Sequence, residues 1–225
     1  DNGGVGDVGI AKVDVLQNET NLGYGGGANV GISAAMEKGA EWIVILNQDV
    51  VLREKSVHTF IEKLGDSRAG IAGPFVGRLD PARWTTMLGG KKAGKMYISG
   101  SVMAIHRDVL ERAGNFYEPY FLYYEEVDLC MRAVRKGFQL THLPVSGISH
   151  KESVSLGAGS VAHEYYLARN HMLFVERRAP WSVKFHEFAR LPKTYVEHKS
   201  RGNQGALRGM HDYLLRKFGP LEEHV

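Results

Sequence analysis

Asp49 follows an apolar segment that a soluble protein would bury. The segment is Trp42–Leu46, and the polar pair Asn47-Gln48 separates it from the carboxylate. A carboxylate at the end of a buried strand is costly unless it binds a cation or a hydrogen-bond donor. Asn and Asp also end strands in turns, where their side chains cap backbone amides. A binding site and a simple turn are therefore equally open here.

A second acidic group, Glu125, Glu126 and Asp128, lies in "FLYYEEVDLCMR". Negative charge is favourable in the first turn of a helix, so a helix cap is one interpretation. The preceding aromatic residues are too apolar for an exposed turn, which favours a cleft in which one carboxylate acts as general base. Glu125 and Asp128 share a face with Arg132 and can pair with it. This leaves Glu126 as the expected base.

His150 ends the segment "PVSGISH", beyond an expected strand, and could face the same cleft as Asp49. A lone His is nevertheless more often structural. The segment "NLGYGGGANVG", residues 21–31, matches a loose dinucleotide fingerprint with Asp49 some twenty residues on. Residues 17–22 separate it from the preceding expected strand, which weakens that match. A plain turn before a helix, with backbone amides suited to a phosphate, is the other interpretation.

Strands and helices are expected to alternate along the chain. Periodicity predicts helices after the glycine turn at 25–39, at 54–64 and at 125–136, and strands at 13–16, 42–46, 70–76, 97–105 and 138–143. The pattern indicates a doubly wound α/β domain with a mostly parallel sheet flanked by helices, in which 42–46 is covered on both faces. Residues 77–95 are expected to form a mobile loop. Beyond residue 163 the pattern is helical, with an apolar stripe of Leu207, Met210, Leu214 and Phe218.

Composition excludes several classes of protein. The single cysteine, Cys130, rules out an intramolecular disulfide and a cysteine-based zinc cluster. The longest apolar run is far shorter than the roughly 20 residues of a membrane helix. Residues 1–150 contain 16 Lys and Arg against 17 Asp and Glu, and residues 151–225 contain 12 against 8. Such a basic tail suits nucleic acid, anionic lipid or a phosphorylated substrate, or is a plain solvated face.

Six segments in order resemble the inverting family 2 glycosyltransferases of the GT-A fold. They are "DNGG", "NLGYGGGANVG", "ILNQDV", the stretch from "ISGSVMA" to "VRKGF", "ISH" and "YYLARN". The rhamnosyltransferase-like enzymes of bacterial surface-polysaccharide synthesis are the most similar. The resemblance implies a GT-A catalytic domain over residues 1–174, without the first strand that the family has before Asp1. Residues 175–225 would be a helical C-terminal extension.

The resemblance implies transfer of a sugar from a nucleotide-diphosphate donor, such as dTDP-rhamnose or a UDP-sugar, to a saccharide or lipid-linked saccharide. It also implies Mn²⁺ or Mg²⁺ as cofactor, and a His ligand favours Mn²⁺. Glu126 would be the catalytic base, with Glu125, Asp128 and Arg132 in support. Asp49 and His150 would bind the metal. The residues implied to bind the nucleotide sugar are Asp1, Asn29, Asn47, Asp49, Gly100 and Arg169.

Two alternatives stay open. The family usually has Asp where this chain has Glu126, so a catalytically inactive sugar-nucleotide-binding protein is one. Asn47 replaces the first Asp of the family's Asp-x-Asp motif, a common variant that leaves more of the metal binding to Asp49. A nicotinamide-dependent oxidoreductase is the other. We expect a cytoplasmic protein without a nucleic-acid partner. An amphipathic surface could rest on the inner membrane face or pack against the catalytic domain; it comprises Trp181, Phe185, Phe188, Lys184, Arg190 and Lys193.

Overall fold

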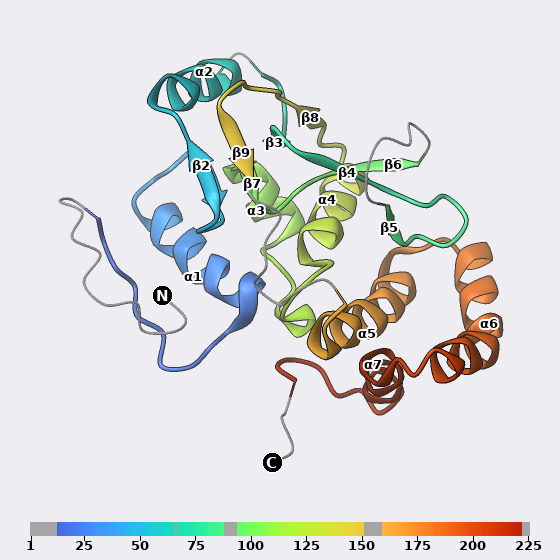
Figure 1. Ribbon diagram of the computed structural model, residues 1–225. Helices are drawn as coiled ribbons and strands as arrows, with labels where there is room; N and C mark the ends of the chain where they lie inside the picture. Colours follow the sequence, from blue (N-terminus) through green and yellow to red (C-terminus); the bar gives the residue numbers. More distant parts are fainter. Residues whose placement is uncertain (1–12, 66, 88–93, 151–158, 222–225) are drawn as a thin grey trace.

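The computed structural model describes residues 13–65, 67–87, 94–150 and 159–221, which form a mixed α/β arrangement (Figure 1). The strands are β1 (Trp42–Leu46), β2 (Val50–Leu52), β3 (Ile71–Gly73), β4 (Val76–Leu79), β5 (Thr86–Met87), β6 (Lys95–Ile98), β7 (Val102–His106), β8 (Leu140–His142) and β9 (Ile148–His150). The helices are α1 (Gly23–Glu37), α2 (Glu54–Gly65), α3 (Arg107–Ala113), α4 (Glu125–Arg135), α5 (Val161–Arg178), α6 (Trp181–Ser200) and α7 (Gln204–Leu214), with a 3₁₀ turn at Glu118–Tyr120.

The main sheet has the strand order β1-β7-β3-β8 and is mixed rather than mostly parallel. Within the described residues only the pair β3–β8 is parallel, whereas β7 runs antiparallel to both β1 and β3. The expected strand 97–105 is broken at residues 99–101 into β6 and β7. The antiparallel pairing of β4 with β6 turns the chain back on itself. As a result β7 returns beside β3 in the opposite direction without a crossover helix.

Strand β1 has the predicted bounds, but it is not covered on both faces as predicted. Ile43 is buried, whereas Val44 and Leu46 are 38% and 47% exposed. Among the described strands β1 pairs only with β7, so its other edge is not covered by a strand. The predicted strand at 13–16 is also wrong, because this segment has no regular secondary structure and its Val13 and Val15 side chains are exposed.

The predicted strand 70–76 divides at Pro74 into β3 and β4, because proline cannot donate to a sheet. The described part of the predicted loop 77–95 is not a plain loop, because parts of it belong to β4, β5 and β6, which form a separate three-stranded sheet. Strands β2 and β9 form a two-stranded sheet that joins residue 50 to residue 150. Neither β2 nor β9 was predicted, and together they shape the candidate site.

Helices α5, α6 and α7 gather at one side of the molecule, away from α2 (Figure 1). Helix α7 lies very close to α5 because Gly205 and Gly209 have no side chains: a Cβ there would lie 2.2 Å from the Val161 carbonyl oxygen and 2.3 Å from that of Tyr165. The predicted apolar stripe is only partly correct, because Leu214 ends α7 and is 64% exposed. In the described part of the chain, no helix combines the length and apolarity that a membrane span requires.

Candidate active site

The pairing of β2 with β9 brings Asp49 and His150 together. Val50 is aligned with His150, so Asp49, one residue earlier, lies beside the imidazole. Asp49 Oδ1 is 3.2 Å from His150 Nε2. Within the described part of the chain, both Asp49 oxygens and this nitrogen are nevertheless buried and make no hydrogen bond. Buried polar atoms normally have partners, so this pair fits a ligand or cation that approaches from outside the chain.

A carboxylate and an imidazole are suitable donors for a divalent cation such as Mn²⁺. No group of three or more His, Cys, Asp or Glu side chains able to hold a metal occurs among the described residues. Asp49 and His150 would thus supply only part of a coordination shell. This fits a cation that shares its remaining positions with water and substrate phosphates, as Mg²⁺ commonly does.

Asn47 lies beside the segment that contains Gly100 because β1 pairs with β7, in which Leu46 is aligned with Val102. The Asn47 amide donates to the carbonyl of Ser101 at 2.9 Å, and the Asn47 carbonyl accepts from Val50 at 3.2 Å, which closes the turn that carries Asp49. The Tyr24 hydroxyl donates to the Gly100 carbonyl at 2.6 Å. Backbone contacts therefore connect the Asp49 turn to the start of α1.

Glu125 and Glu126 begin α4 in a buried environment surrounded by tyrosines. Glu125 is 3% exposed, and its Oε2 has no hydrogen-bond partner. Burial and the neighbouring Glu126 charge raise the pKa of Glu125 well above its usual range. Burial also raises the pKa of Glu126. The negative charge of either carboxyl raises the free-energy cost of ionising the other in such a site.

Asp128 belongs to the structural core and not to a reactive cleft. It is fully buried, accepts from Arg132 Nε at 2.7 Å and from Arg178 Nε at 2.5 Å, and also accepts from the Tyr120 hydroxyl at 3.2 Å. The predicted pairing of Asp128 with Arg132 is confirmed. The prediction that Glu125 also pairs with Arg132 is wrong, because the other nitrogens of the Arg132 guanidinium donate to the carbonyls of residues 113–115.

The loop before α4 has an unusual backbone. Phe121, Tyr123 and Tyr124 have φ of 64°, 67° and 77°, values that bulky residues rarely adopt. Asn170 Nδ2 donates to the carbonyls of residues 120, 122 and 123 at 2.8, 2.6 and 3.0 Å. Arg169 donates to the Tyr120 carbonyl at 2.8 Å. These two α5 residues therefore hold the loop that presents the acidic pair.

Arg169 was predicted to touch diphosphate or acceptor, but its side chain is enclosed by protein. It is fully buried, and it also donates to the Gly219 carbonyl at 2.7 Å. Its guanidinium lies 5.0 Å from the Tyr166 ring centroid. In this structure the Arg169 charge is directed at the chain's own carbonyls and aromatic rings.

Helix α1 supports the same loop. Gly23 has φ +71°, and a Cβ on it would lie 2.3 Å from the Phe121 carbonyl oxygen, which accepts from the Tyr24 amide at 2.8 Å. The Gly23 amide donates to Asn21 Oδ1 at 2.8 Å. These first amides are therefore already occupied and not free for a phosphate. The described residues before the helix form no strand, which removes the context that a dinucleotide fingerprint needs.

Asn29 was predicted to border the donor. Its side-chain amide donates to the Phe116 carbonyl at 3.0 Å and to Glu118 Oε1 at 2.9 Å, and its Oδ1 accepts from the Phe116 amide at 3.0 Å. The amide therefore joins α1 to the segment that leads into the 3₁₀ turn. Asp1 lies outside the described residues.

Sequence reasoning missed Arg178 and Asn170, which complete the support of the acidic helix. Both lie on α5, about fifty residues from the groups that they contact. Asn170 stands in the segment "YYLARN", but that motif does not identify the carbonyls that it contacts, and nothing in the sequence marks Arg178.

Residues 9–114 match the family described as Glycosyl transferase family 2. The match includes Asn29, Asn47, Asp49 and Gly100 and ends before the acidic pair. The chain is 24% identical to an N-acetylglucosaminyl-diphospho-decaprenol L-rhamnosyltransferase of Mycobacterium tuberculosis, an alignment that covers 76% of this chain and 69% of the relative.

Two further relatives are similar at the same level. The dTDP-rhamnosyl transferase RfbF of Shigella flexneri is 25% identical, with coverage of 75% of this chain and 64% of the relative. The low-salt glycan biosynthesis hexosyltransferase Agl10 of Haloferax volcanii is 25% identical, with coverage of 72% and 59%. The chain thus spans less than two thirds of the length of these two relatives. Together with the family match, they show that the chain carries a glycosyl transferase family 2 domain, is homologous to rhamnosyltransferases and is a glycosyltransferase.

Proposed function

We propose that this protein has the GT-A fold and transfers a sugar, with inversion, from a nucleotide-diphosphate donor to a hydroxyl of a saccharide or lipid-linked saccharide in bacterial surface-polysaccharide synthesis. The observation that carries the proposal is the buried, unpartnered Asp49–His150 pair of a glycosyltransferase domain. Relatives named for rhamnosyl transfer favour dTDP-rhamnose over a UDP-sugar as donor.

Asp49 and His150 would hold Mn²⁺ or Mg²⁺ together with the donor phosphates. A bound cation would neutralise charge on the leaving diphosphate. Asn47 and Gly100 shape the adjoining turn through their backbone contacts, whereas Asn29 and Arg169 support the site from within the protein. Asp1 is proposed to contact the nucleoside.

Glu126 is the proposed general base. It accepts the proton of the acceptor hydroxyl, the hydroxyl oxygen bonds to the anomeric carbon, and the bond from that carbon to the diphosphate oxygen breaks. The nucleoside diphosphate leaves, and a single displacement inverts the configuration. Glu125, the more enclosed carboxyl, retains a proton, so that Glu126 remains ionised and basic.

We place the catalytic domain at residues 1–174 and the helical extension at 175–225, with a cytoplasmic location at the inner membrane face. The boundary falls within α5, whose residues Arg169, Asn170 and Arg178 all support the loop and helix of the acidic pair. We therefore move the end of the catalytic unit from residue 174 to the end of α5 at Arg178.

Thermal unfolding with a panel of nucleotide sugars, with and without Mn²⁺, tests the proposal. Donor at one hundred times its Kd should add about 2.7 kcal/mol to the free energy of unfolding. Asp49→Ala should remove the Mn²⁺-dependent part, whereas Asp14→Ala, a change of an exposed carboxylate, should not. Stabilisation by NADH alone would favour the oxidoreductase, and donor binding without release of nucleoside diphosphate would favour the inactive binding protein.

A further inference from the structure

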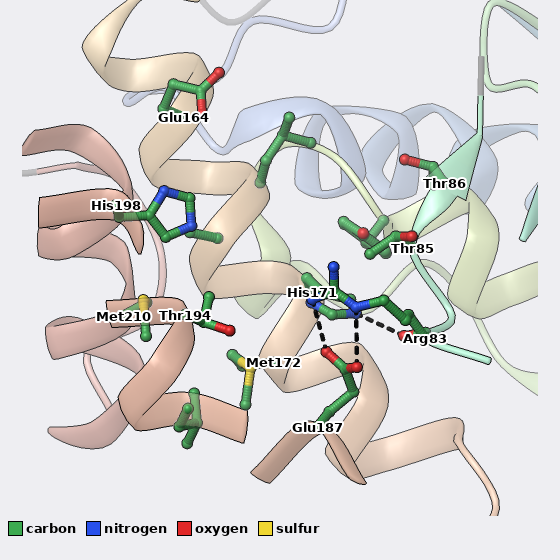
Figure 2. A pocket seen from close by; sticks show the side chains of 14 residues that line it. Arg83, Thr85, Thr86, Glu164, His171, Met172, Glu187, Thr194, His198 and Met210 are labelled. Carbon is green, nitrogen blue, oxygen red and sulfur yellow. Dashed lines mark hydrogen bonds and ion pairs between the residues drawn. The ribbon is translucent and has the colours of Figure 1, made fainter. Parts of the chain in front are cut away.

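A pocket of about 260 Å³ lies between the β4–β5 hairpin and helices α5, α6 and α7, and Tyr124 forms part of its wall (Figure 2). Among the described residues, none that was predicted as catalytic, donor-binding or metal-binding lines it. Figure 2 shows the pair Arg83–Glu187 at one side and His198 with Glu164 at the other. The volume is at the lower end of the range for small-molecule sites and suits one small ring.

The described lining residues offer no free positive charge. Arg83 is the only Lys or Arg among them, and this side chain makes a bidentate ion pair with the buried Glu187 at 3.0 and 3.1 Å. Burial lowers the pKa of His171, and likewise that of His198, so both rings are neutral at pH 7. The Glu164 carboxylate adds negative character. Phosphate, diphosphate or a sugar acid would therefore be desolvated here without a cationic partner.

Neutral hydrogen-bonding groups alternate with apolar ones along the wall. His198 Nδ1 is buried without a partner, and Thr85 and Thr194 contribute hydroxyls. The apolar surface comes from Leu167, Ala168, Met172, Leu191 and Met210. A neutral sugar ring has the complementary pattern, because its hydroxyls can bond to the polar groups while its C–H faces pack on the aliphatic ones.

The pocket adjoins the acidic pair through Tyr124. This residue immediately precedes Glu125. Burial raises the pKa of the Tyr124 phenol most, the hydrogen bonds to Thr86 lower it, and the Glu126 charge raises it further. Tyr24, at the start of α1, bonds to Gly100, next to the Ser101 carbonyl that holds the Asp49 turn. Tyr24 therefore connects the start of α1 to the turn that carries Asp49, and Tyr124, which precedes the acidic pair, lines the neutral pocket.

We infer that this pocket binds a neutral sugar residue of the acceptor, and that its lining selects against charged acceptors. The inference rests on the proposed glycosyl transfer, but it concerns residues outside the proposed donor and metal site. Thr194 and His198, on α6, are the specificity-determining residues that it assigns.

Saturation-transfer NMR with methyl glycosides of neutral hexoses and N-acetylhexosamines, and with a methyl glucuronide as the charged probe, tests this assignment. Thr194→Trp should weaken neutral glycoside binding at least tenfold by filling the pocket. Val196→Trp, on the exposed opposite side of α6, should leave it unchanged. Thr194→Val and His198→Phe preserve shape and should weaken binding roughly 3–10-fold by removing one hydrogen bond each.

Binding of dTDP and UDP with Mn²⁺, measured on the same proteins, separates the two claims. Nucleotide binding that persists in Thr194→Trp while the glycoside is lost supports the pocket. Unchanged glycoside affinity in all three pocket variants, absent glycoside binding to the wild type, or equal affinity for the glucuronide would overturn the pocket assignment and leave the donor site standing. Absent nucleotide binding to the wild type would instead defeat the proposed function.

Discussion

At the residue scale, two adjacent glutamates in one buried site are expected to differ in role. Glu126→Gln keeps the shape and removes the basicity, so it should lower kcat by roughly 10²–10⁴-fold with little change in donor affinity. Glu125→Gln should remain near wild type, because glutamine resembles a protonated carboxyl. Turnover and donor binding should be measured separately on both variants. Normal turnover in Glu126→Gln together with loss in Glu125→Gln would reverse the assignment.

The same residue pair gives a prediction about stability and pH. The folded-state pKa of Glu125 is raised above its unfolded value, so between the two values the folded protein binds more protons. The free energy of unfolding therefore falls as pH rises above about 4.5. Glu125→Gln has no such proton to lose, so its Tm relative to wild type should increase from pH 4.5 to pH 8. A constant difference across this range would show that Glu125 ionises without cost.

Sequence patterns singled out candidate acids but did not reveal the residues that surround them. Asp49 and the Glu125–Glu126 pair were conspicuous because each adjoins a locally readable apolar segment. The burial of Arg169 and the ion pair from Arg178 to Asp128 depend on how α5 packs fifty residues later in the chain. No local sequence pattern encodes this packing, so nothing in the sequence indicates that the Arg169 side chain is buried against the chain's own carbonyls.

At the element scale, the loop before α4 depends on α5 for its shape. Asn170→Asp replaces a group that donates to three carbonyls with one that only accepts, in a fully buried position. We expect the free energy of unfolding to fall by about 3 kcal/mol or more. We also expect kcat to fall more than tenfold while donor affinity in the folded fraction is kept, because the loop presents Glu126.

Asn115→Asp is the matched control, since Asn115 is exposed and only its backbone carbonyl is used. Chemical denaturation and initial-rate kinetics at a temperature well below both midpoints would separate stability from turnover. If Asn170→Asp were destabilised but turned over normally when folded, the hydrogen bonds from Asn170 to the loop before α4 would serve stability alone.

Elements with strong periodicity were predicted closely, and short ones were not. The helices at 54–65 and 125–135 and the strand at 42–46 agree with their sequence patterns. Residues 97–105 were predicted as one strand because Ser-Gly-Ser at 99–101 is too short a break to be recognised within an apolar segment. Strand β9 has only three residues, and pairing with β2, not composition, makes it a strand.

At the scale of the whole molecule, part of the predicted membrane-facing surface is exposed and part is not. Trp181 and Phe185, one helical turn apart, are 83% and 78% exposed, and Lys184 lies 5.2 Å from the Trp181 ring centroid. Phe188 instead packs on the core against Tyr213. Arg190 pairs with Glu197. Lys193 is exposed but lies 4.0 Å from Glu197, so the exposed aromatic part of the surface is the first turn of α6.

We propose that this first turn of α6 rests on an anionic membrane surface, close to a lipid-linked acceptor. Co-sedimentation with vesicles containing anionic lipid should capture the wild type at low salt and less of it at high salt, because the charge term is screened. Trp181→Ser combined with Phe185→Ser should weaken binding at least tenfold, since each aromatic ring contributes about 1.5–3 kcal/mol when buried. Leu214→Ser removes a similarly exposed apolar side chain from α7 and should have no effect. If the wild type stays in the supernatant at low salt, the exposed rings do not serve a membrane contact.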